Sequence, residues 1–124
     1  MTVAYLKVRK QFGVPIGSFQ VLQHRAVDMF VEVELLRSTA ILAGVKADDA
    51  DREERQRAVS IAKAQLAVGG KLVVQQAVQL HGGIGCTDEH DVGLYFKRMT
   101  ALAALYGDEE HHLARYAGRA AFDV

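Results

Sequence analysis

The sequence predicts an all-α fold, an antiparallel up-and-down four-helix bundle with short loops between the helices. Three observations support this class. Apolar residues recur every three or four positions over two long stretches, which is the period of an amphipathic helix. No stretch alternates apolar and polar residues over the length that a strand requires. The single proline, Pro15, lies in a turn ahead of the first long stretch, where its fixed φ does no harm.

The first long helix is expected to open at Ser18 or a neighbour and to run to about residue 44. At ~1.5 Å per residue this makes a rod of roughly 40 Å. Its apolar seam consists of Phe19, Leu22, Ala26, Met29, Val33, Leu36, Ala40 and Ala43. An acidic link over residues 45–51 follows, and Asp48 or Asp49 is expected to cap the next helix.

The second long helix has more apolar surface than one seam requires. Its seam consists of Val59, Ala62, Leu66, Gly69, Val73, Gln76 and Leu80. A further apolar stripe consists of Ala64, Ala67, Val68, Val74, Ala77 and Val78. A helix that is apolar over most of its circumference is buried on several sides. The stripe therefore indicates either a central core helix or a subunit interface, and both remain open at this point.

A shorter helix is expected from an apolar pattern that runs from Val92 to Tyr106. Thr87 or Asp88 is the expected cap of this helix. A full capping box is not predicted, because the position three residues after Thr87 holds His90 in place of Glu or Gln.

The last helix is expected to begin behind an Asp108 cap and to end near Gly118 or at the C-terminus. Its first turn contains a Glu-x-x-His motif, Glu109 to His112, of the kind that helps to hold di-iron centres in helical bundles. Such centres need a glutamate on each of two helices and a Glu-x-x-His motif on each of two others. Glu32 and Glu34 could supply glutamates, but the sequence has no second Glu-x-x-His motif. The adjacent histidines are therefore expected on a solvated helix face, and no metal site is predicted.

Composition narrows the class of protein. A chain of 124 residues is long enough for one domain with a real core. Its 15 basic and 15 acidic residues balance, and no basic patch indicates a nucleic-acid partner. The lone cysteine, Cys86, excludes an internal disulfide and fits a reducing compartment. No apolar run approaches the ~18 residues of a membrane span and no signal peptide is visible, so a cytoplasmic protein is predicted.

Two segments about 70 residues apart are the most informative part of the chain. The first, Arg9 to Gln20, reads R-K-Q-F-G-V-P-I-G-S-F-Q and is followed by Val27-Asp28-Met29. The second, Gln79 to Gly85, reads Q-L-H-G-G-I-G at the end of the second long helix. Glycines there allow a helix to stop and a backbone or flat ligand to approach closely.

These segments resemble the C-terminal domain of acyl-CoA dehydrogenases. The pattern of that family is R-x-x-F-G-x-x-I-x-x-F-Q followed by A-D-M, and then Q-x-x-G-G-x-G one long helix later. The resemblance extends over nearly the whole chain, from about Tyr5 to Arg119, and the spacing between the blocks is kept. The resemblance implies that this chain is one domain, residues 1–124, and that the family's N-terminal helical domain and middle β-domain are absent from it.

The resemblance also implies FAD, held between two subunits. Arg9 matches an arginine that reaches the FAD pyrophosphate of a neighbouring subunit, for which a guanidinium offers a rigid fork of donors. In the first motif, Phe12, Ile16 and Gln20 match further residues that contact the dinucleotide in the family. In the second motif, Gln79, Leu80 and Gly83 match residues that contact its adenosine end. Taken without the motif, Arg9 would be a solvated arginine, Phe12 a core residue and Gln79 a helix cap.

The chain departs from the family at the catalytic base. In many members a Tyr-Glu-Gly-Thr segment supplies the glutamate that takes the α-proton of the acyl-CoA. Here that segment reads Tyr106-Gly107-Asp108-Glu109, so Gly107 stands where the base is expected and Glu109 where a threonine would contact flavin. A second family pattern places the base ahead of the first motif, outside this chain. Asp108 and Glu109 remain weak candidates, because a slip of one residue turns a helical side chain by ~100°.

The resemblance therefore favours the C-terminal, oligomerising and FAD-contacting domain of a flavoprotein from a branch that lacks the usual glutamate. The full assembly is expected to dehydrogenate an acyl-CoA thioester at its α,β-bond and to pass electrons to an electron-transfer flavoprotein. The chain alone is expected to be inactive and to work as a homo- or hetero-oligomer. The alternative is a non-catalytic helical oligomerisation module or partner subunit with no flavin role.

Overall fold

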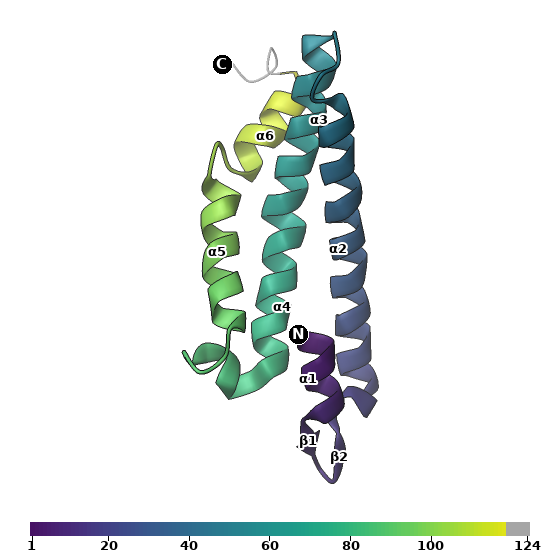
Figure 1. The fold of residues 1–124 in the computed structure, drawn as a ribbon, viewed down its shortest axis with the longest axis vertical. Helices are drawn as coiled ribbons and strands as arrows, with labels where there is room; N and C mark the ends of the chain where they lie inside the picture. The colour runs from purple at the N-terminus through teal and green to yellow at the C-terminus, as the bar shows by residue number, and fades with distance from the viewer. Residues whose placement is uncertain (119–124) are drawn as a thin grey trace.

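The N-terminal segment forms a short helix and a hairpin that lead into the first long helix (Figure 1). The computed structural model describes residues 1–118. The elements of this segment are α1 (Thr2–Val8), β1 (Lys10–Gln11), β2 (Val14–Pro15) and the 3₁₀ turn η1 (Ile16–Ser18). The strands β1 and β2 pair antiparallel, and the N–H of Ile16 donates to the carbonyl of Arg9 at 2.8 Å to close the hairpin. The hairpin lies at one end of the bundle (Figure 1).

The first long helix, α2 (Gln20–Lys46), begins and ends within two residues of its predicted bounds. Phe19 occupies the N-cap position, and the hydroxyl of Ser18 donates to the carbonyl of Pro15 at 2.7 Å rather than capping the helix. The predicted seam is the side that faces α3 and α4, and most of its members are half-buried. None of the 27 residues of α2 is fully buried, so the helix lies at the edge of the bundle.

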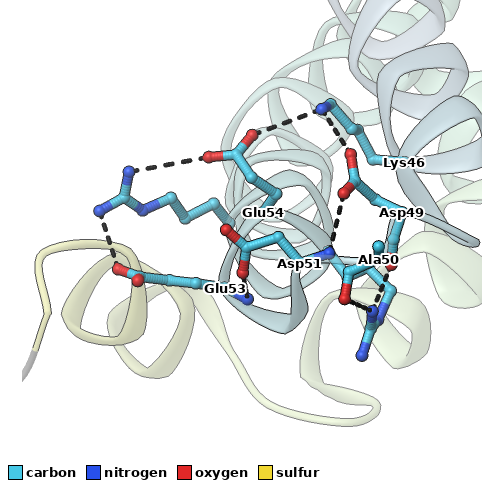
Figure 2. A network of polar contacts seen from close by, with 8 residues as sticks. Lys46, Asp49, Ala50, Asp51, Glu53 and Glu54 are labelled. Atoms are coloured by element: carbon cyan, nitrogen blue, oxygen red, sulfur yellow. Dashed lines mark hydrogen bonds and ion pairs between the residues drawn. The ribbon is translucent and has the colours of Figure 1, made fainter.

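An acidic corner joins α2 to α3 (Arg52–Gln65), and Figure 2 shows its polar contacts. Asp51 is the N-cap of α3, because its Oδ1 accepts a hydrogen bond of 2.8 Å from the N–H of Glu53. The prediction that Asp48 or Asp49 caps this helix is therefore wrong. Asp49 instead accepts from the N–H of Asp51 at 3.0 Å and so shapes the loop ahead of the cap.

Lys46 ties this corner together (Figure 2). Its Nζ lies 2.7 Å from Asp49 Oδ2 and 3.5 Å from Glu54 Oε2, so one ammonium bridges the end of α2 and the start of α3. The hydrogen bond to Lys46 lowers the pKa of the Asp49 carboxyl, and the same contact raises the pKa of Lys46. Both groups therefore stay charged at neutral pH and fix the turn between the two helices.

The second long rod is one helix by sequence but is interrupted in the structure. A π-helical segment, η2 (Leu66–Gly70), separates α3 from α4 (Lys71–His81). A Cβ on Gly70 would lie 2.7 Å from the Sδ of Met99, and one on Gly69 would collide with the side chains of Glu32 and Gln65. The two glycines therefore let neighbouring helices approach closely at the interruption.

The additional apolar stripe of this rod belongs mainly to the core. Ala67, Val74 and Ala77 are buried, with 6%, 8% and 8% of their surface exposed. Val68 is the exception, because 48% of its surface is exposed. The central-helix interpretation therefore holds for the buried members. Ala64 and Val78 are half-buried, and Val68 is the exposed member that an interface could use.

The chain then passes through a 3₁₀ segment, η3 (Gly82–Cys86), into α5 (Val92–Ala104). Asp91 holds the N-cap position of α5 and makes no side-chain hydrogen bond, so the prediction that Thr87 or Asp88 caps this helix is wrong. The Thr87 hydroxyl instead donates to the Ile84 carbonyl at 2.8 Å and accepts from the Glu89 N–H at 3.3 Å, which orders the loop ahead of the helix.

The last described helix, α6 (Glu109–Tyr116), packs against α3. The Asp108 cap is confirmed, because its Oδ1 accepts from the N–H of His111 at 2.9 Å. The predicted end near Gly118 is two residues late. The expected solvated histidine face is wrong for His112, of which 2% is exposed, and burial lowers the pKa of its imidazole.

The antiparallel helical bundle and the all-α class are confirmed (Figure 1). The rod of α3 and α4 lies between α2 on one side and α5 with α6 on the other (Figure 1). Among residues 1–118, no helix has the length and apolar character needed to cross a membrane. The same residues contain no cluster of three or more potential metal ligands.

Candidate functional site

The glycine-rich turn after α4 is shaped by backbone requirements. Gly82 ends the helix with φ at +64°, a left-handed conformation that favours glycine. A Cβ on Gly85 would lie 2.6 Å from the carbonyl oxygen of Val78, so the turn folds back onto its own helix. Nothing lies within 4 Å of the position that a Cβ would take on Gly82 or Gly83. These two glycines therefore leave open space beside the chain.

A cavity of about 510 Å³ lies between this turn and the N-terminal segment. Its walls come from α1, from the hairpin and η1, from the first turns of α2, and from the end of α4. Five of the seven residues predicted to contact a dinucleotide line it: Arg9, Ile16, Gln79, Leu80 and Gly83. The fold thus brings the two sequence motifs together, although about 70 residues separate them in the chain.

The remaining two predicted residues, Phe12 and Gln20, do not line the cavity. Phe12 lies at the tip of the hairpin with 90% of its surface exposed, so it is not a core residue. Its φ is +54°, which is uncommon for any residue other than glycine and marks a strained position of the kind that gathers at functional sites. Gln20 is the exposed first residue of α2.

The cavity is cationic. Arg9 and Arg25 both line it, and no aspartate or glutamate does so among the described residues. An Arg25 guanidinium N–H donates to Gln76 Oε1 at 3.4 Å, whereas the Arg9 guanidinium pairs with no carboxylate within residues 1–118. A guanidinium that is not neutralised suits an anionic ligand with planar oxygen acceptors, such as a phosphate group.

An aromatic cluster closes one side of the cavity. The centroid of the His81 ring lies 4.5 Å from that of the Tyr5 ring and 4.3 Å from that of the His90 ring. The Tyr5 hydroxyl donates to the His81 carbonyl at 3.2 Å, which fastens α1 to the end of α4. These contacts hold the wall formed by α1 against the glycine turn.

His81 has one ring nitrogen that its surroundings do not satisfy. The residue is 3% exposed, and its Nδ1 lies 2.7 Å from the carbonyl of Ala77. Because a carbonyl only accepts, Nδ1 carries a proton in this contact and donates it. Nε2 is buried and has no hydrogen-bond partner among the described residues. An orphaned polar atom in the wall of a cavity is a feature that a bound ligand or water can satisfy.

The position of the missing base lies elsewhere in the molecule. Gly107 has φ at +105°, and a Cβ there would lie 2.5 Å from the His111 ring and 3.1 Å from His112 Nε2. Asp108 and Glu109 are exposed, and Asp108 is engaged as the cap of α6. Both carboxylates line a second cavity, of about 1000 Å³, whose apolar floor includes Val74.

Sequence reasoning missed Tyr5, Arg25 and His81 as parts of the first cavity. Arg25 adjoins the seam residue Ala26, so its exposure to a cavity follows only from how α2 packs on α4. His81 stands inside the second motif, but its burial depends on Tyr5, which is far away in the sequence. Of these three residues, only Tyr5 could have been found from the sequence, because it is an aromatic residue one helical turn before Arg9.

The chain is similar to known proteins over nearly its full length. A family model described as "Acyl-CoA dehydrogenase, C-terminal domain" matches residues 1–121. The curated acyl-CoA dehydrogenase IpdE2 of Mycolicibacterium smegmatis is 40% identical over 115 residues, which are 93% of this chain and 35% of that protein. The chain therefore spans about a third of the length of this relative.

Solved structures give the same result for the fold. The Tcur3481–Tcur3483 steroid ACAD, solved as its G363A variant, is 34% identical with a TM-score of 0.88, covering 94% of this chain and 32% of that chain. The ChsE4–ChsE5 complex of Mycobacterium tuberculosis is 31% identical with a TM-score of 0.87, covering 94% and 31%. The butyryl-CoA dehydrogenase of Megasphaera elsdenii is 27% identical with a TM-score of 0.87, covering 95% and 30%.

Proposed function

Because the chain belongs to the acyl-CoA dehydrogenase family as its C-terminal helical domain, we propose that it contacts FAD and joins subunits in such an enzyme. The complete assembly oxidises an acyl-CoA thioester to the 2,3-enoyl-CoA and passes electrons to an electron-transfer flavoprotein. The observation that carries this proposal is the cationic cavity, which Arg9 and Gly83 both line although they belong to different sequence motifs. The proposal assigns this chain a binding and assembly role.

The cavity residues fit a dinucleotide. The Arg9 guanidinium offers a fork of donors to a pyrophosphate, and the open space beside Gly83 admits a flat ring system close to the backbone. The Gln79 amide can both donate to and accept from a ribose or an adenine. Phe12, at the exposed hairpin tip, offers an aromatic face to the same ligand from beyond the cavity rim. FAD, if bound here, would supply the acceptor for the hydride that the thioester loses.

We assign no residue of the Gly107 turn as the base that takes the proton from the thioester. Glycine has no titratable group, and Asp108 accepts a hydrogen bond from the N–H of His111 as the cap of α6. Glu109 is the exposed first residue of α6. We therefore assign the base to another subunit or to a part of the assembly outside this chain. One solved relative is a complex of two differently named subunits, ChsE4 and ChsE5, which supports a mixed assembly.

The distribution of apolar surface supports the assembly role. Half of the residues are hydrophobic, yet the fully buried apolar residues among residues 1–118 are few and mostly small. They are Leu6, Ala58, Ala67, Val74, Ala77, Leu80 and Val92. Large exposed apolar surfaces on a soluble chain mark interfaces. The chain therefore has more apolar surface than its own core uses.

The names of the relatives support a contact with the cofactor rather than with the acyl group. One solved relative is named for a steroid and another for butyryl-CoA, which are very different substrates. Both match this chain with TM-scores of 0.88 and 0.87. A domain whose fold is shared across such substrates is suited to bind what the enzymes have in common.

The test is a titration of the chain with FAD, followed by flavin fluorescence and by ¹⁵N NMR, which also detects weak binding. We expect amide shifts confined to the cavity, at Gly82 and Gly83 above all. Arg9→Ala should weaken binding by roughly 10-fold or more, because a charge-assisted hydrogen bond contributes about 1.5–3 kcal/mol. Arg37→Ala is the matched control, since Arg37 is an exposed arginine on α2 outside the cavity.

Two results would contradict the proposal. The first is a chain whose amide spectrum does not respond to FAD, which would favour the alternative of an oligomerisation module with no flavin role. The second is an equal loss of affinity in Arg9→Ala and Arg37→Ala, because that would indicate non-specific attraction of an anion to positive charge.

A further inference from the structure

The cationic cavity contains a second arginine that the contacts assigned to the cofactor do not use. Arg25 lines this cavity together with Arg9, and both residues are exposed. Arg9 lies between α1 and the hairpin, whereas Arg25 lies in the second turn of α2. Neither guanidinium forms an ion pair with a carboxylate among residues 1–118. The cavity therefore has two positive charges available for a ligand.

The backbones that carry the two arginines are attached to one short segment, the 3₁₀ turn η1. The N–H of Ile16 donates to the Arg9 carbonyl at 2.8 Å, which attaches Arg9 to this turn. The side-chain amide of Gln23 donates to the Gly17 carbonyl at 2.8 Å, which attaches the start of α2 to it. Gly17 also packs against α1, because a Cβ there would lie 2.9 Å from the Leu6 carbonyl oxygen. These contacts fix the separation of the two arginine backbones.

The Arg25 side chain is directed by Gln76 of α4. Gln76 is the polar member of the otherwise apolar seam of the α3–α4 rod, and it is half-buried. An amide in such a seam loses hydrogen bonds to water, which is costly unless a partner replaces them. Its Oε1 accepts from a guanidinium N–H of Arg25 at 3.4 Å. This contact uses one of the five N–H donors of the guanidinium, so the others remain available to a ligand.

Two guanidiniums on separate elements match a pyrophosphate. In a dinucleotide each of the two phosphates carries one negative charge, and each offers oxygen acceptors to the donor fork of an arginine. A mononucleotide places a similar total charge on a single phosphorus, because the second pKa of a phosphate monoester is about 6. A pair of arginines can therefore distinguish how the charge is arranged, which one arginine cannot do.

From these observations we propose that Arg25 is the second arm of a two-arginine clamp, in which Arg25 holds one phosphate of a pyrophosphate and Arg9 holds the other. Gln76 is the positioning residue of the clamp, because it does not itself line the cavity and acts through Arg25. The inference rests on the proposed function and names the residues that select the ligand at that site. The clamp makes the cavity selective for nucleotides with a pyrophosphate diester.

The first test compares two adenosine compounds of similar net charge by ¹⁵N NMR titration of the whole chain. ADP-ribose contains a pyrophosphate diester, and AMP contains one phosphate. The wild-type chain should bind ADP-ribose roughly 10-fold more tightly than AMP, because a second charge-assisted contact forms. Arg25→Ala should weaken the binding of ADP-ribose by roughly 10-fold and that of AMP much less, since Arg9 still holds one phosphate. The matched control, Arg37→Ala, changes an exposed arginine of α2 outside the cavity and should alter neither affinity.

The second test examines Gln76 in a double-mutant cycle. Gln76→Leu keeps the approximate size of the side chain and removes the acceptor, so it should weaken the binding of ADP-ribose by roughly 3-fold. In the Arg25→Ala chain the same change should cause no further loss, because the amide acts through the guanidinium. Gln76→Glu should weaken binding more than Gln76→Leu does, since a carboxylate would pair with Arg25 and neutralise it. Circular dichroism would verify that each variant is folded.

Three results would overturn the clamp. They are an affinity for ADP-ribose that Arg25→Ala leaves unchanged, an equal loss of affinity for ADP-ribose and AMP in that variant, and losses from Gln76→Leu and Arg25→Ala that simply add. An equal loss would indicate a general attraction of anions to positive charge.

Failure of the clamp and failure of the proposed function can be distinguished by titration with FAD. If Arg9→Ala weakens the binding of FAD and Arg25→Ala does not, the proposed function stands and the clamp is wrong. A wild-type chain that binds neither FAD nor ADP-ribose would contradict both.

Discussion

A side chain at position 107 should destabilise the chain. Gly107 follows the helix α5 and adopts a φ of +105°, a region that residues with a Cβ rarely enter. A Cβ there would also lie 2.5 Å from Cδ2 of His111 and 3.1 Å from Nε2 of His112. The perturbation is Gly107→Ala, which adds one methyl group and no new charge.

The magnitude has two parts. Holding a residue with a Cβ at positive φ costs about 1–2 kcal/mol. The His111 ring is exposed and can turn away, but His112 is buried and its Nε2 lies 3.1 Å from the Tyr106 carbonyl. Displacing this hydrogen bond adds about 0.5–1.5 kcal/mol. For a total of roughly 2 kcal/mol, a domain of this size should lose roughly 6–12 °C in melting temperature.

The assay is thermal unfolding followed by circular dichroism, with Gly13→Ala as the matched control. Gly13 also has a positive φ, +81°, but nothing lies within 4 Å of its Cβ position. The control therefore measures backbone strain alone, and the difference between the two variants measures crowding by the histidines. Replacing His111 with alanine in the Gly107→Ala chain should recover only the smaller part of the loss.

A Gly107→Ala chain that melts at the wild-type temperature would refute the reasoning, as would one no less stable than Gly13→Ala. The same logic extends to Gly107→Glu, which places a glutamate where the resemblance to the family leads us to expect the base. We expect this variant to be destabilised at least as much as Gly107→Ala. It should not bring dehydrogenase activity to the chain.

Three further predictions follow from the described contacts. Asp51→Ala should destabilise the chain by about 1 kcal/mol in urea unfolding, whereas Asp48→Ala should have little effect, because only Asp51 caps α3. Burial lowers the pKa of His112 from its ordinary 6.5, so the unfolded state takes up this proton first and stability should fall as pH decreases below 6.5. His112→Gln should reduce that pH dependence, measured as the change in urea midpoint between about pH 7.5 and pH 5.5, roughly one unit to either side of the ordinary value. Ser60→Ala should cost about 1 kcal/mol in the same assay, since the fully buried Ser60 hydroxyl is the 3.5 Å neighbour of His112 Nδ1.

The sequence predicted those features that depend on local pattern. The seam of α2 follows from spacing alone, and the Asp108 cap follows from an aspartate placed directly ahead of a polar first turn. The two motifs predicted five lining residues of one cavity because each motif shapes its own backbone, one through a hairpin and the other through glycines. The all-α class needed nothing more than the helical period.

The features that could not be predicted depend on contacts between distant residues. Three aspartates, Asp48, Asp49 and Asp51, are equally good caps by type. In the structure Asp49 pairs with Lys46, and Asp51 accepts the hydrogen bond from the N–H of Glu53. The π-segment η2 lies where Gly70 meets Met99 of α5, a contact that no local period encodes. His112 is buried because α6 folds back onto α3, where Ser60 receives it.

The structure around position 107 fits glycine and no larger residue. A glutamate could act as a base at position 107 only if the backbone there changed and the rings of His111 and His112 moved. His112 in turn contacts the Tyr106 carbonyl and Ser60, so it cannot move without leaving buried polar groups unpaired. The turn and α6 therefore form a unit that fits glycine. The turn therefore supports our proposal that a catalytic assembly takes its base from elsewhere and that this chain contributes the cationic cavity at the far end of α4.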